Sequence, residues 1–311
     1  MSQLVYKFSA NKIQQMKEFY TSFSLAPPPG AIFRAKTKDA VITAYKSGKV
    51  LFQGSSPEKE AANWLDEAQR VESKAKTIKQ KPNHSYVPSP DLFNQNHIGT
   101  DEAGTGDYFG PITVAGVYLT ETNMVQLKSE GVTDSKALTD KKIRELANTI
   151  LTRKIPYASA ILHNKKYNAL QKQGWSQGKM KAMLHHHVIR QLLNKIGDTP
   201  NQGIIIDQFC EPAVYQKYLM SEKQTLAPST FFLTKAESYS TAVAAASILA
   251  RASFLNQMDK LSKQLGLELP KGAAPKVDRI IAKIIIEYGA DILDSYAKVH
   301  FKNTKKAYAY L

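Results

Sequence analysis

The first 65 residues combine one helical pattern of apolar positions with three short strand patterns. Apolar side chains recur at helical spacing between Ile13 and Phe23. Strand-forming residues then dominate three runs, namely AIFRAK at 31–36, AVITAY at 40–45 and KVLFQG at 49–54. A tight turn at Ser47-Gly48 joins the last two runs, and a second helix is expected after Ser56 as its N-cap. We therefore predict a small α/β unit of one helix, three strands and a closing helix.

The periodicity disappears between residues 71 and 95, where three prolines interrupt a polar sequence. Such a composition is typical of a linker between domains. A chain of 311 residues is long enough for two domains. We predict an N-terminal domain over residues 1–70, a linker over 71–95 and a larger domain over 96–311.

The larger segment begins with strand patterns and then alternates between strands and helices. Five runs have strand character, namely HIGTDEA, ITVAGVYLT, IPYASAIL, GIIIDQF and STFFLT. The near-continuous apolar run GIIIDQF is expected of a strand that is buried on both faces. The longest helical pattern is the Ala- and Ser-rich stretch AESYSTAVAAASILARASFLNQMDKLSKQL. This order predicts an α/β fold in which a mixed sheet carries helices on both faces.

Composition and charge favour a globular protein that contacts polyanions. Apolar residues make up 43% of the chain, and no run approaches the roughly 18 to 20 apolar residues of a membrane span. The 42 Lys and Arg against 27 Asp and Glu leave a net charge of +15. Such an excess attracts nucleic acid through counterion release. A basic surface kept for solubility is the alternative, and an anionic membrane is disfavoured because no strongly basic amphipathic helix with a bulky apolar face is evident.

The start of the chain and its cysteine content favour a reducing, cytoplasmic compartment. The sequence MSQLVYKFSANK lacks the charged-then-apolar order of a signal peptide. The single Cys210 excludes an internal disulfide framework and a multi-cysteine zinc site. The run His185 to His187 does not match the HExxH pattern, so no zinc site is expected there either.

Four acidic residues occur within or beside apolar stretches that are expected to be buried. Asp101 and Glu102 adjoin in the first strand of the larger segment, Asp207 interrupts the apolar run GIIIDQF, and Glu237 begins the Ala-rich helix. Burying several carboxylates together is costly unless a cation compensates. Mg²⁺ and Mn²⁺ prefer oxygen ligands, so acids clustered in a basic protein indicate metal-assisted phosphoryl chemistry, with two ions about 4 Å apart.

Each acid also has a purely structural interpretation. Asp207 would end its strand and cap the following turn. Glu237 would complete a capping box that begins at Thr234. Glu102 would point to solvent if Asp101 points inward, because neighbouring strand residues face opposite sides. The residue pattern leaves both interpretations open for these three acids.

Glycines follow the acid pair after Ala103, in the stretch GTDEAGTGDYFGP. The segment Gly104-Thr105-Gly106 permits positive φ and leaves main-chain amides accessible to a phosphate or a sugar. An ordinary hairpin turn is the alternative. The stretch matches neither the P-loop nor the G-x-G-x-x-G pattern, which disfavours a nucleotide cofactor.

Taken together, seven stretches resemble bacterial ribonuclease HIII, a type 2 ribonuclease H: DEAGTGDYFGPITVAGVYL, TDSKALTDKKI, KMKAMLHHHVI, IIIDQF, KAESYSTAVAAASILAR, LPKGA and KVHFKNT. The resemblance covers essentially all of 96–311. It implies a ribonuclease H-like mixed five-stranded sheet with flanking helices, and a small N-terminal α/β domain that resembles one half of the TATA-binding protein and binds substrate. It also implies an endonuclease that cuts the RNA strand of RNA/DNA hybrids with two Mg²⁺ or Mn²⁺ ions, leaving 3′-hydroxyl and 5′-phosphate ends.

The family motifs assign roles to residues of this chain. Four residues match the catalytic acids and metal ligands, namely Asp101, Glu102, Asp207 and Glu237. The resemblance assigns recognition of the 2′-hydroxyl, which distinguishes RNA from DNA, to main-chain groups around Gly104, Thr105 and Gly106. Further substrate contacts are expected at Ser135, Lys136, Lys165 and Lys181, although a solvated helix face is the alternative for each lysine.

Two features depart from the family pattern. Asn164-Lys165 stands where a proline-containing version is expected, which puts the local strand-to-helix geometry in question. The tyrosine that ribonuclease HII uses at RNA–DNA junctions has no counterpart in its usual motif. Its absence favours activity on runs of ribonucleotides over single embedded ribonucleotides.

Two other functions are compatible with parts of the pattern. A resolvase or transposase on the same fold would share the clustered acids but not the glycine loop. A noncatalytic hybrid-binding protein would share the basic surface. The combined pattern predicts a monomeric nuclease that acts on RNA/DNA hybrids in the cytoplasm, with no membrane contact.

Overall fold

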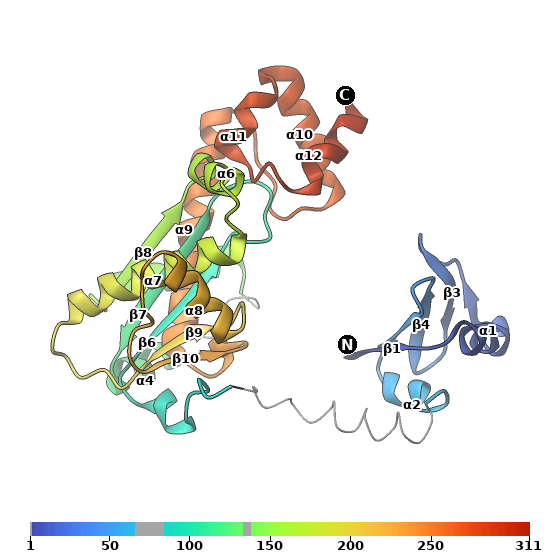
Figure 1. Ribbon diagram of the computed structural model, residues 1–311, viewed down its shortest axis with the longest axis horizontal. Helices are drawn as coiled ribbons and strands as arrows, with labels where there is room; N and C mark the ends of the chain where they lie inside the picture. Colours follow the sequence, from blue (N-terminus) through green and yellow to red (C-terminus); the bar gives the residue numbers. More distant parts are fainter. Residues whose placement is uncertain (1, 66–83, 133–137) are drawn as a thin grey trace. The chain divides into compact units, whose positions relative to one another are not determined.

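The computed structural model describes residues 2–65, 84–132 and 138–311. It divides the chain into two compact units, residues 1–83 and 84–311, each with a hydrophobic core of its own (Figure 1). Ser135 and Lys136, which the sequence predicts to contact substrate, lie outside the described residues.

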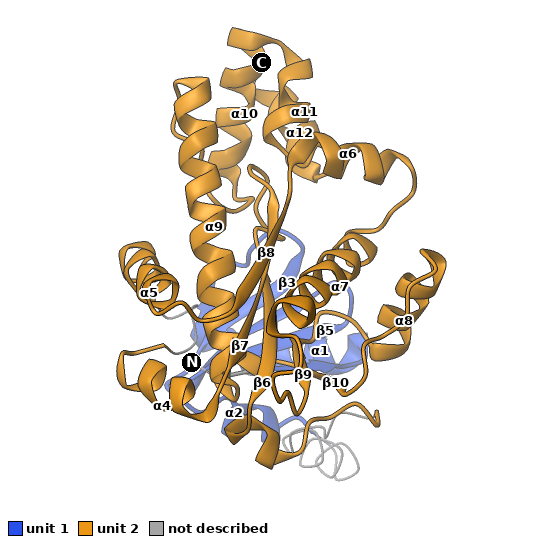
Figure 2. Ribbon diagram, turned by 90° about the vertical axis from the view of Figure 1, so that its left-hand side faces the viewer, with its two compact units in different colours: residues 1–83 blue, residues 84–311 orange. Residues whose placement is uncertain are grey.

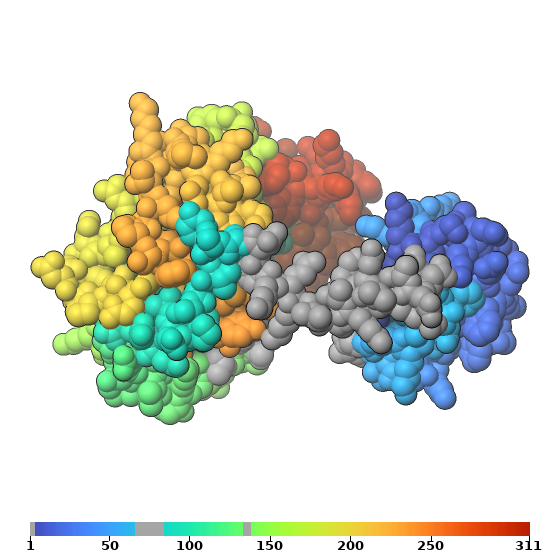
Figure 3. All heavy atoms as spheres, turned by 60° about the horizontal axis from the view of Figure 1, so that its bottom comes forward, coloured from blue at the N-terminus to red at the C-terminus, as the bar shows by residue number. Residues whose placement is uncertain are grey.

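The second unit begins at His84, within the segment 71–95 that the sequence assigns to a linker. In the short 3₁₀ turn η2 (Pro90–Asn94), Leu92 is buried in a cluster with Ile205 and Val243. Upstream, the backbone of Phe232 donates a hydrogen bond to the carbonyl of Tyr86 at 2.8 Å. The segment that begins at residue 84, teal in the space-filling view, therefore packs against the rest of the second unit (Figure 3).

The N-terminal unit is a five-stranded antiparallel sheet in the order β1-β5-β4-β3-β2. Its strands are β1 (Ser2–Lys7), β2 (Ser24–Leu25), β3 (Ala31–Lys36), β4 (Ala40–Tyr45) and β5 (Lys49–Gly54). The three predicted strands occupy the predicted residues, and Gly48 forms the predicted turn at φ +83°. The sequence pattern did not indicate β1, which is as long as the predicted strands, or the two-residue strand β2.

Two helices cover one face of this sheet, namely α1 (Ala10–Phe19) and α2 (Pro57–Ala62). Alternate strand residues such as Phe33, Ile42 and Phe52 form the core beneath them. Ser56 occupies the predicted N-cap position of α2, but its side chain makes no capping hydrogen bond. The opposite face of the sheet carries the remaining strand side chains, and no helix among residues 2–65 covers it (Figure 1).

The second unit contains the predicted mixed five-stranded sheet, in the order β10-β9-β6-β7-β8. Its strands are β6 (His97–Ala103), β7 (Ile112–Leu119), β8 (Tyr157–Leu162), β9 (Ile204–Asp207) and β10 (Thr230–Leu233). β6, β7 and β8 pair antiparallel, whereas β9 is parallel to both β6 and β10. All five predicted strands are confirmed.

Helices pack on both faces of this sheet (Figure 2). One face carries α9 (Thr241–Leu265), with α4 (Glu121–Ser129) and α5 (Asp140–Thr152) in the same core, and the other carries α7 (Gln177–Ile196) and α8 (Pro212–Ser221). The remaining helices are α6 (Asn164–Lys172), α10 (Pro275–Tyr288), α11 (Leu293–Tyr296) and α12 (Lys302–Ala307). Among the described residues, no helix has the length and apolar character needed to span a membrane.

The contact between β6 and α9 depends on a residue without a side chain. A Cβ at Gly99 would collide with the backbone of Ala242 and Val243 at the start of α9. The helix therefore lies directly on the strand that bears Asp101, and the position of the acid follows from this close approach.

We expect Gly99→Ala to lower the unfolding free energy of the second unit by about 1 to 3 kcal/mol or more, because backbone atoms cannot yield as a side chain can. Gly106→Ala is the matched control, since Gly106 has open space around its Cα and lacks a left-handed φ. Calorimetric melting of both variants checks the prediction, and equal melting temperatures would contradict it.

Candidate active site

The two adjacent acids point to opposite faces of β6. Thr100 faces α7, where its Oγ1 lies 2.8 Å from Nδ1 of His185. Asp101 faces α9 and accepts a hydrogen bond from Ser247. Glu102 returns to the α7 side. Strand alternation therefore separates the acids, and the open end of the strand lets both reach the same cavity.

Asp207 joins them through the strand register. Thr100 pairs with Ile206 in the parallel ladder, so the next residue of each strand places Asp207 beside Asp101. Asp207 is the last residue of β9, as predicted. Its Oδ1 accepts a hydrogen bond from the backbone amide of Ala236 at 2.9 Å.

Glu237 lies in a separate 3₁₀ turn, η4 (Ala236–Ser238), and is buried. The expectation that it begins the Ala-rich helix is wrong, because α9 starts four residues later in the chain, at Thr241. The capping-box interpretation is also wrong, since Ser240 is the N-cap and accepts from the amide of Val243 at 3.2 Å. Glu237 instead comes directly after Ala236, whose backbone amide donates to Asp207.

A cavity of about 430 Å³ lies over these strand ends. Its lining residues are Asp101, Glu102, Ala103, Gly104, Leu138, Asp140, Asp207, Ser247 and Arg251. The structure thus brings three of the four predicted acids into one cavity. Glu237 is not among the lining residues, but it follows Ala236, whose amide donates to Asp207 of the cavity.

Burial and like charge raise the pKa of Asp101 well above its usual range. The loss of hydration is the largest cause, and the carboxylates of Asp207 and Glu102 add to it. A divalent cation would remove this repulsion, and the donors are the carboxylate oxygens that Mg²⁺ and Mn²⁺ prefer. Among the described residues, however, no three His, Cys, Asp or Glu side chains form a ready-made metal site. The donor chemistry of the three carboxylates nevertheless fits a divalent ion.

Glu102 has cationic and hydrogen-bonding partners on α7. Nζ of Lys181 donates to its Oε1 at 2.7 Å, and Nε2 of His185 lies 3.0 Å from its Oε2. Burial alone would raise the pKa of Glu102, but these two partners hold it below its usual value. Lys181, predicted to contact phosphate, contacts an acid in this structure. The sequence missed His185, although the spacing of four residues places both partners on one face of α7.

A second charged group borders the cavity on the α9 side. Nη2 of Arg251 lies 3.4 Å from Oδ1 of Asp140, which also pairs with Lys271. Partial burial would raise the pKa of Asp140, and these two cations hold it below its usual value. The sequence missed Asp140 and Lys271 because their partners come from distant parts of the chain.

The glycine loop after β6 contains glycines with different roles. Gly104 and Gly110 adopt positive φ angles of +87° and +81°, and a Cβ at either position would press on Phe254 of α9. Gly106 is exposed, and no atom lies within 4 Å of where its Cβ would be. The fold requires glycine at positions 104 and 110 but not at position 106. Lys165, another predicted contact, is exposed on α6 and does not line the cavity.

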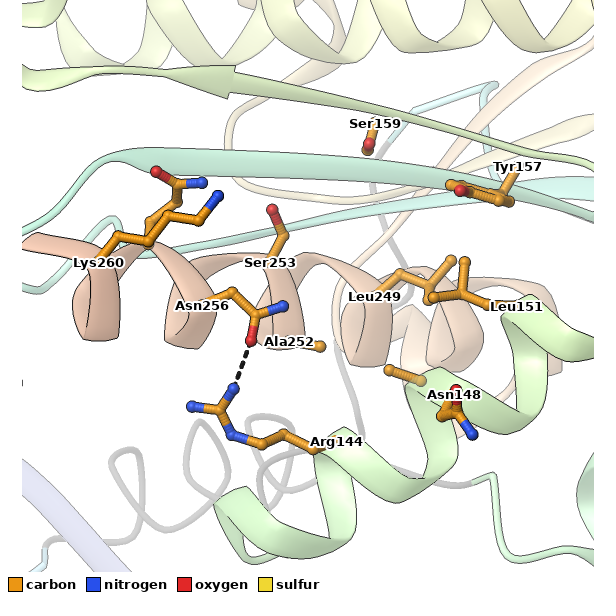
Figure 4. A pocket seen from close by; sticks show the side chains of 12 residues that line it. Arg144, Asn148, Leu151, Tyr157, Ser159, Leu249, Ala252, Ser253, Asn256 and Lys260 are labelled. Atoms are coloured by element: carbon orange, nitrogen blue, oxygen red, sulfur yellow. Dashed lines mark hydrogen bonds between the residues drawn. The ribbon is translucent and has the colours of Figure 1, made fainter.

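A cavity of about 410 Å³ lies elsewhere on the unit, between α5, α9 and the edge strand β8 (Figure 4). Arg144 of α5 points across it and donates a hydrogen bond to Asn256 of α9. It shares no lining residue with the acidic cavity, and none of its lining residues is acidic. Of these two cavities, only the one at the strand ends is lined by carboxylates.

Comparison with known proteins shows the family of the chain. The family model described as "Ribonuclease HII" matches residues 98–304, and a "Domain of unknown function (DUF3378)" matches residues 3–77. Ribonuclease HIII of Oceanobacillus iheyensis is 57% identical over 99% of both chains. The chain belongs to the ribonuclease HIII family. It is therefore a nuclease of the ribonuclease H class, and its second unit has the ribonuclease H-like fold.

Two further members of the ribonuclease HIII family match over the full chain. Ribonuclease HIII of Bacillus subtilis is 47% identical over 99% of this chain and 97% of the relative. The crystal structure of Bst-RNase HIII in complex with Mn²⁺ is 40% identical, covers 99% of this chain and 98% of that one, and has a TM-score of 0.69.

We expect Lys181→Met to lower the unfolding free energy of the metal-free protein at pH 7 by about 2 kcal/mol, because it leaves a buried carboxylate without its cation. The folded-state pKa of Glu102 is lowered, so this contribution is present above the unfolded pKa and is lost as pH falls through the folded one. The difference in unfolding free energy between wild type and Lys181→Met should therefore shrink toward pH 4 or below. Urea unfolding across pH measures it, with the exposed Lys166→Met as control.

Proposed function

We propose that the protein cleaves the RNA strand of RNA/DNA hybrids endonucleolytically, with two divalent ions, leaving 3′-hydroxyl and 5′-phosphate ends. The observation that carries the proposal is the convergence of Asp101, Glu102 and Asp207 in one cavity that also includes Gly104 of the glycine loop. Carboxylates at the phosphate and accessible main chain at the sugar are the two features that hydrolysis of a ribonucleotide strand requires.

The four acids would hold the metal ions. When bound, Mg²⁺ or Mn²⁺ would lower the pKa of an attacking water and neutralise the departing 3′-oxygen. Lys181 and His185 keep Glu102 ionised and oriented before metal arrives. The Mn²⁺ named for the Bst-RNase HIII crystal structure supports a divalent ion in this family.

Recognition of ribose is assigned to the loop at Gly104, Thr105 and Gly106. Since the fold does not require glycine at position 106, the absence of a side chain there is explained by the close approach of a sugar. Ser135, Lys136 and Lys165 are proposed to contact the nucleic acid backbone, and Arg251 and Lys271 add positive charge on the opposite side of the cavity.

The N-terminal unit is proposed to grip the substrate through the uncovered face of its sheet. Four cations project from that face, namely Lys7, Arg34, Lys36 and Lys49, and apolar Val5 and Leu51 lie among them. None of the five strands contains Asp or Glu. A basic sheet with apolar contacts suits the groove and phosphates of a duplex, and the likeness to one half of the TATA-binding protein that the sequence predicts is part of this proposal. The protein is proposed to act as a monomer in the cytoplasm.

We expect the wild-type protein with Mg²⁺ or Mn²⁺ to cut an RNA/DNA hybrid and to leave RNA and DNA duplexes of the same sequence intact. Asp207→Asn should abolish this cleavage, because it removes a metal-binding charge, while hybrid binding in EDTA changes little. Gel assays with end-labelled strands measure both quantities. Equal cutting of duplex DNA would favour a resolvase or transposase, and undiminished cleavage by the variant would falsify the ligand role of Asp207.

We expect Arg34→Gln combined with Lys49→Gln to weaken hybrid binding and to reduce the slope of log Kd against log salt by about 2, since each phosphate contact contributes about 0.9. Lys17→Gln with Lys59→Gln removes the same charge from exposed positions on α1 and α2 and should leave the slope near wild type. Fluorescence anisotropy in EDTA over a salt series measures both pairs. A slope reduced equally by both would show that only net charge matters.

A further inference from the structure

Two polar side chains hold the glycine loop from the protein side. Nε2 of Gln177 donates to the carbonyl of Thr105 at 3.1 Å, at the start of the loop. Nζ of Lys298 donates to the carbonyls of Asp107 and Gly110, at 2.8 and 2.6 Å, at its end. Lys298 begins the KVHFKNT motif, to which the proposed function gives no task.

We propose that Gln177 and Lys298 are positioning residues that turn the loop carbonyls inward and so present the amide of Gly106 to the ribose. The proposal rests on the function proposed above and extends it to two residues that do not touch substrate.

The peptide between Thr105 and Gly106 determines where the Gly106 amide points. The carbonyl of Thr105 and the amide of Gly106 belong to the same peptide and, in the trans form, point in opposite directions. The hydrogen bond from Gln177 therefore directs the Gly106 amide away from the protein. No residue within the described parts of the chain accepts a hydrogen bond from this amide. It is left as a donor at an exposed position.

The C-terminal part of the chain holds the end of the loop, at Tyr108 and Gly110. Tyr108 donates to the carbonyl of Gly272 at 3.0 Å and accepts from the amide of Lys298 at 2.9 Å. Gly110 donates to the carbonyl of Tyr296 at 2.9 Å. The Lys298 side chain adds two further bonds to this backbone pairing, so the loop has few conformations left to it.

The burial of Lys298 excludes direct contact with substrate. Its side chain is 0% exposed, and burial lowers its pKa to about 7. A desolvated amine is less favourable in a core than an apolar chain of equal length, so global stability does not explain it. The carbonyls of Asp107 and Gly110 explain the presence of Lys298, because buried carbonyls without donors are costly. Asn164 supplies only one other donor, to Gly110 at 2.9 Å.

The test uses the full-length variants Gln177→Glu and Lys298→Met, which keep side-chain size but lose the donor. We expect each to lower kcat/KM on an RNA/DNA hybrid by roughly 10- to 100-fold, the scale of a small misplacement of reacting groups. Hybrid binding in EDTA should stay close to wild type for both variants, and the melting temperature should stay close to wild type for Gln177→Glu. Lys298→Met should melt at a lower temperature, because it leaves buried carbonyls without their donor. Amide hydrogen exchange should become faster at residues 105–110. Gln173→Glu, at an exposed position after α6, is the matched control.

A hybrid with one 2′-deoxynucleotide at the cleavage position separates positioning from a merely structural role. Wild type should lose much activity on it, and the variants should lose proportionately less, because their loop already fails to reach the hydroxyl. Full discrimination with unchanged loop exchange in folded Gln177→Glu would overturn the proposal, even if Lys298→Met fails to fold. If wild type itself ignores the 2′-hydroxyl, the proposed function fails instead.

Discussion

The burial of Asp101 beside two other carboxylates is the constraint on which the second unit is built. Three acids at neighbouring strand ends repel one another most strongly where water is scarce. The fold disperses this charge among different elements. Glu102 is held by Lys181 and His185 on α7, and Asp207 is held by a backbone amide of η4. Asp101 retains a raised pKa, because its burial and the two neighbouring carboxylates disfavour its charged form.

One helix organises most of this cavity. α9 approaches β6 at Gly99, where no Cβ separates them, and it carries Ser247 toward Asp101. One turn further it presents Arg251 to the cavity, and Phe254 then lies beneath the glycine loop. The Ala-rich composition of this helix is thus explained by packing, since small side chains permit the close approach that brings acid, cation and loop together.

Local patterns predicted the parts of the molecule that local forces decide. Five strands of the second unit and the end position of Asp207 followed from apolar runs and their interruption. Glu237 was assigned to the wrong element because Thr234 and Ser240 both offer plausible N-caps, and only tertiary packing selects Ser240. His185 was missed because its partner Glu102 is distant in sequence, so no window of residues contains both. The same reason applies to the grouping of Asp140 with Lys271.

The chemistry and the selectivity of the site are supported by different parts of the chain. The acids stand on β6, β9 and η4, which the central sheet and α9 fix. The glycine loop begins on the same strand but is fastened by Gly272, Tyr296 and Lys298, far along the sequence. If the loop reads the ribose as proposed, a change in the C-terminal segment would alter which sugar is accepted without moving a carboxylate. Under the proposed function, this separation would explain why a motif with a buried lysine lies so far from the acids. The motif would shape the loop proposed to face the sugar, while the sheet shapes the site proposed to face the phosphate.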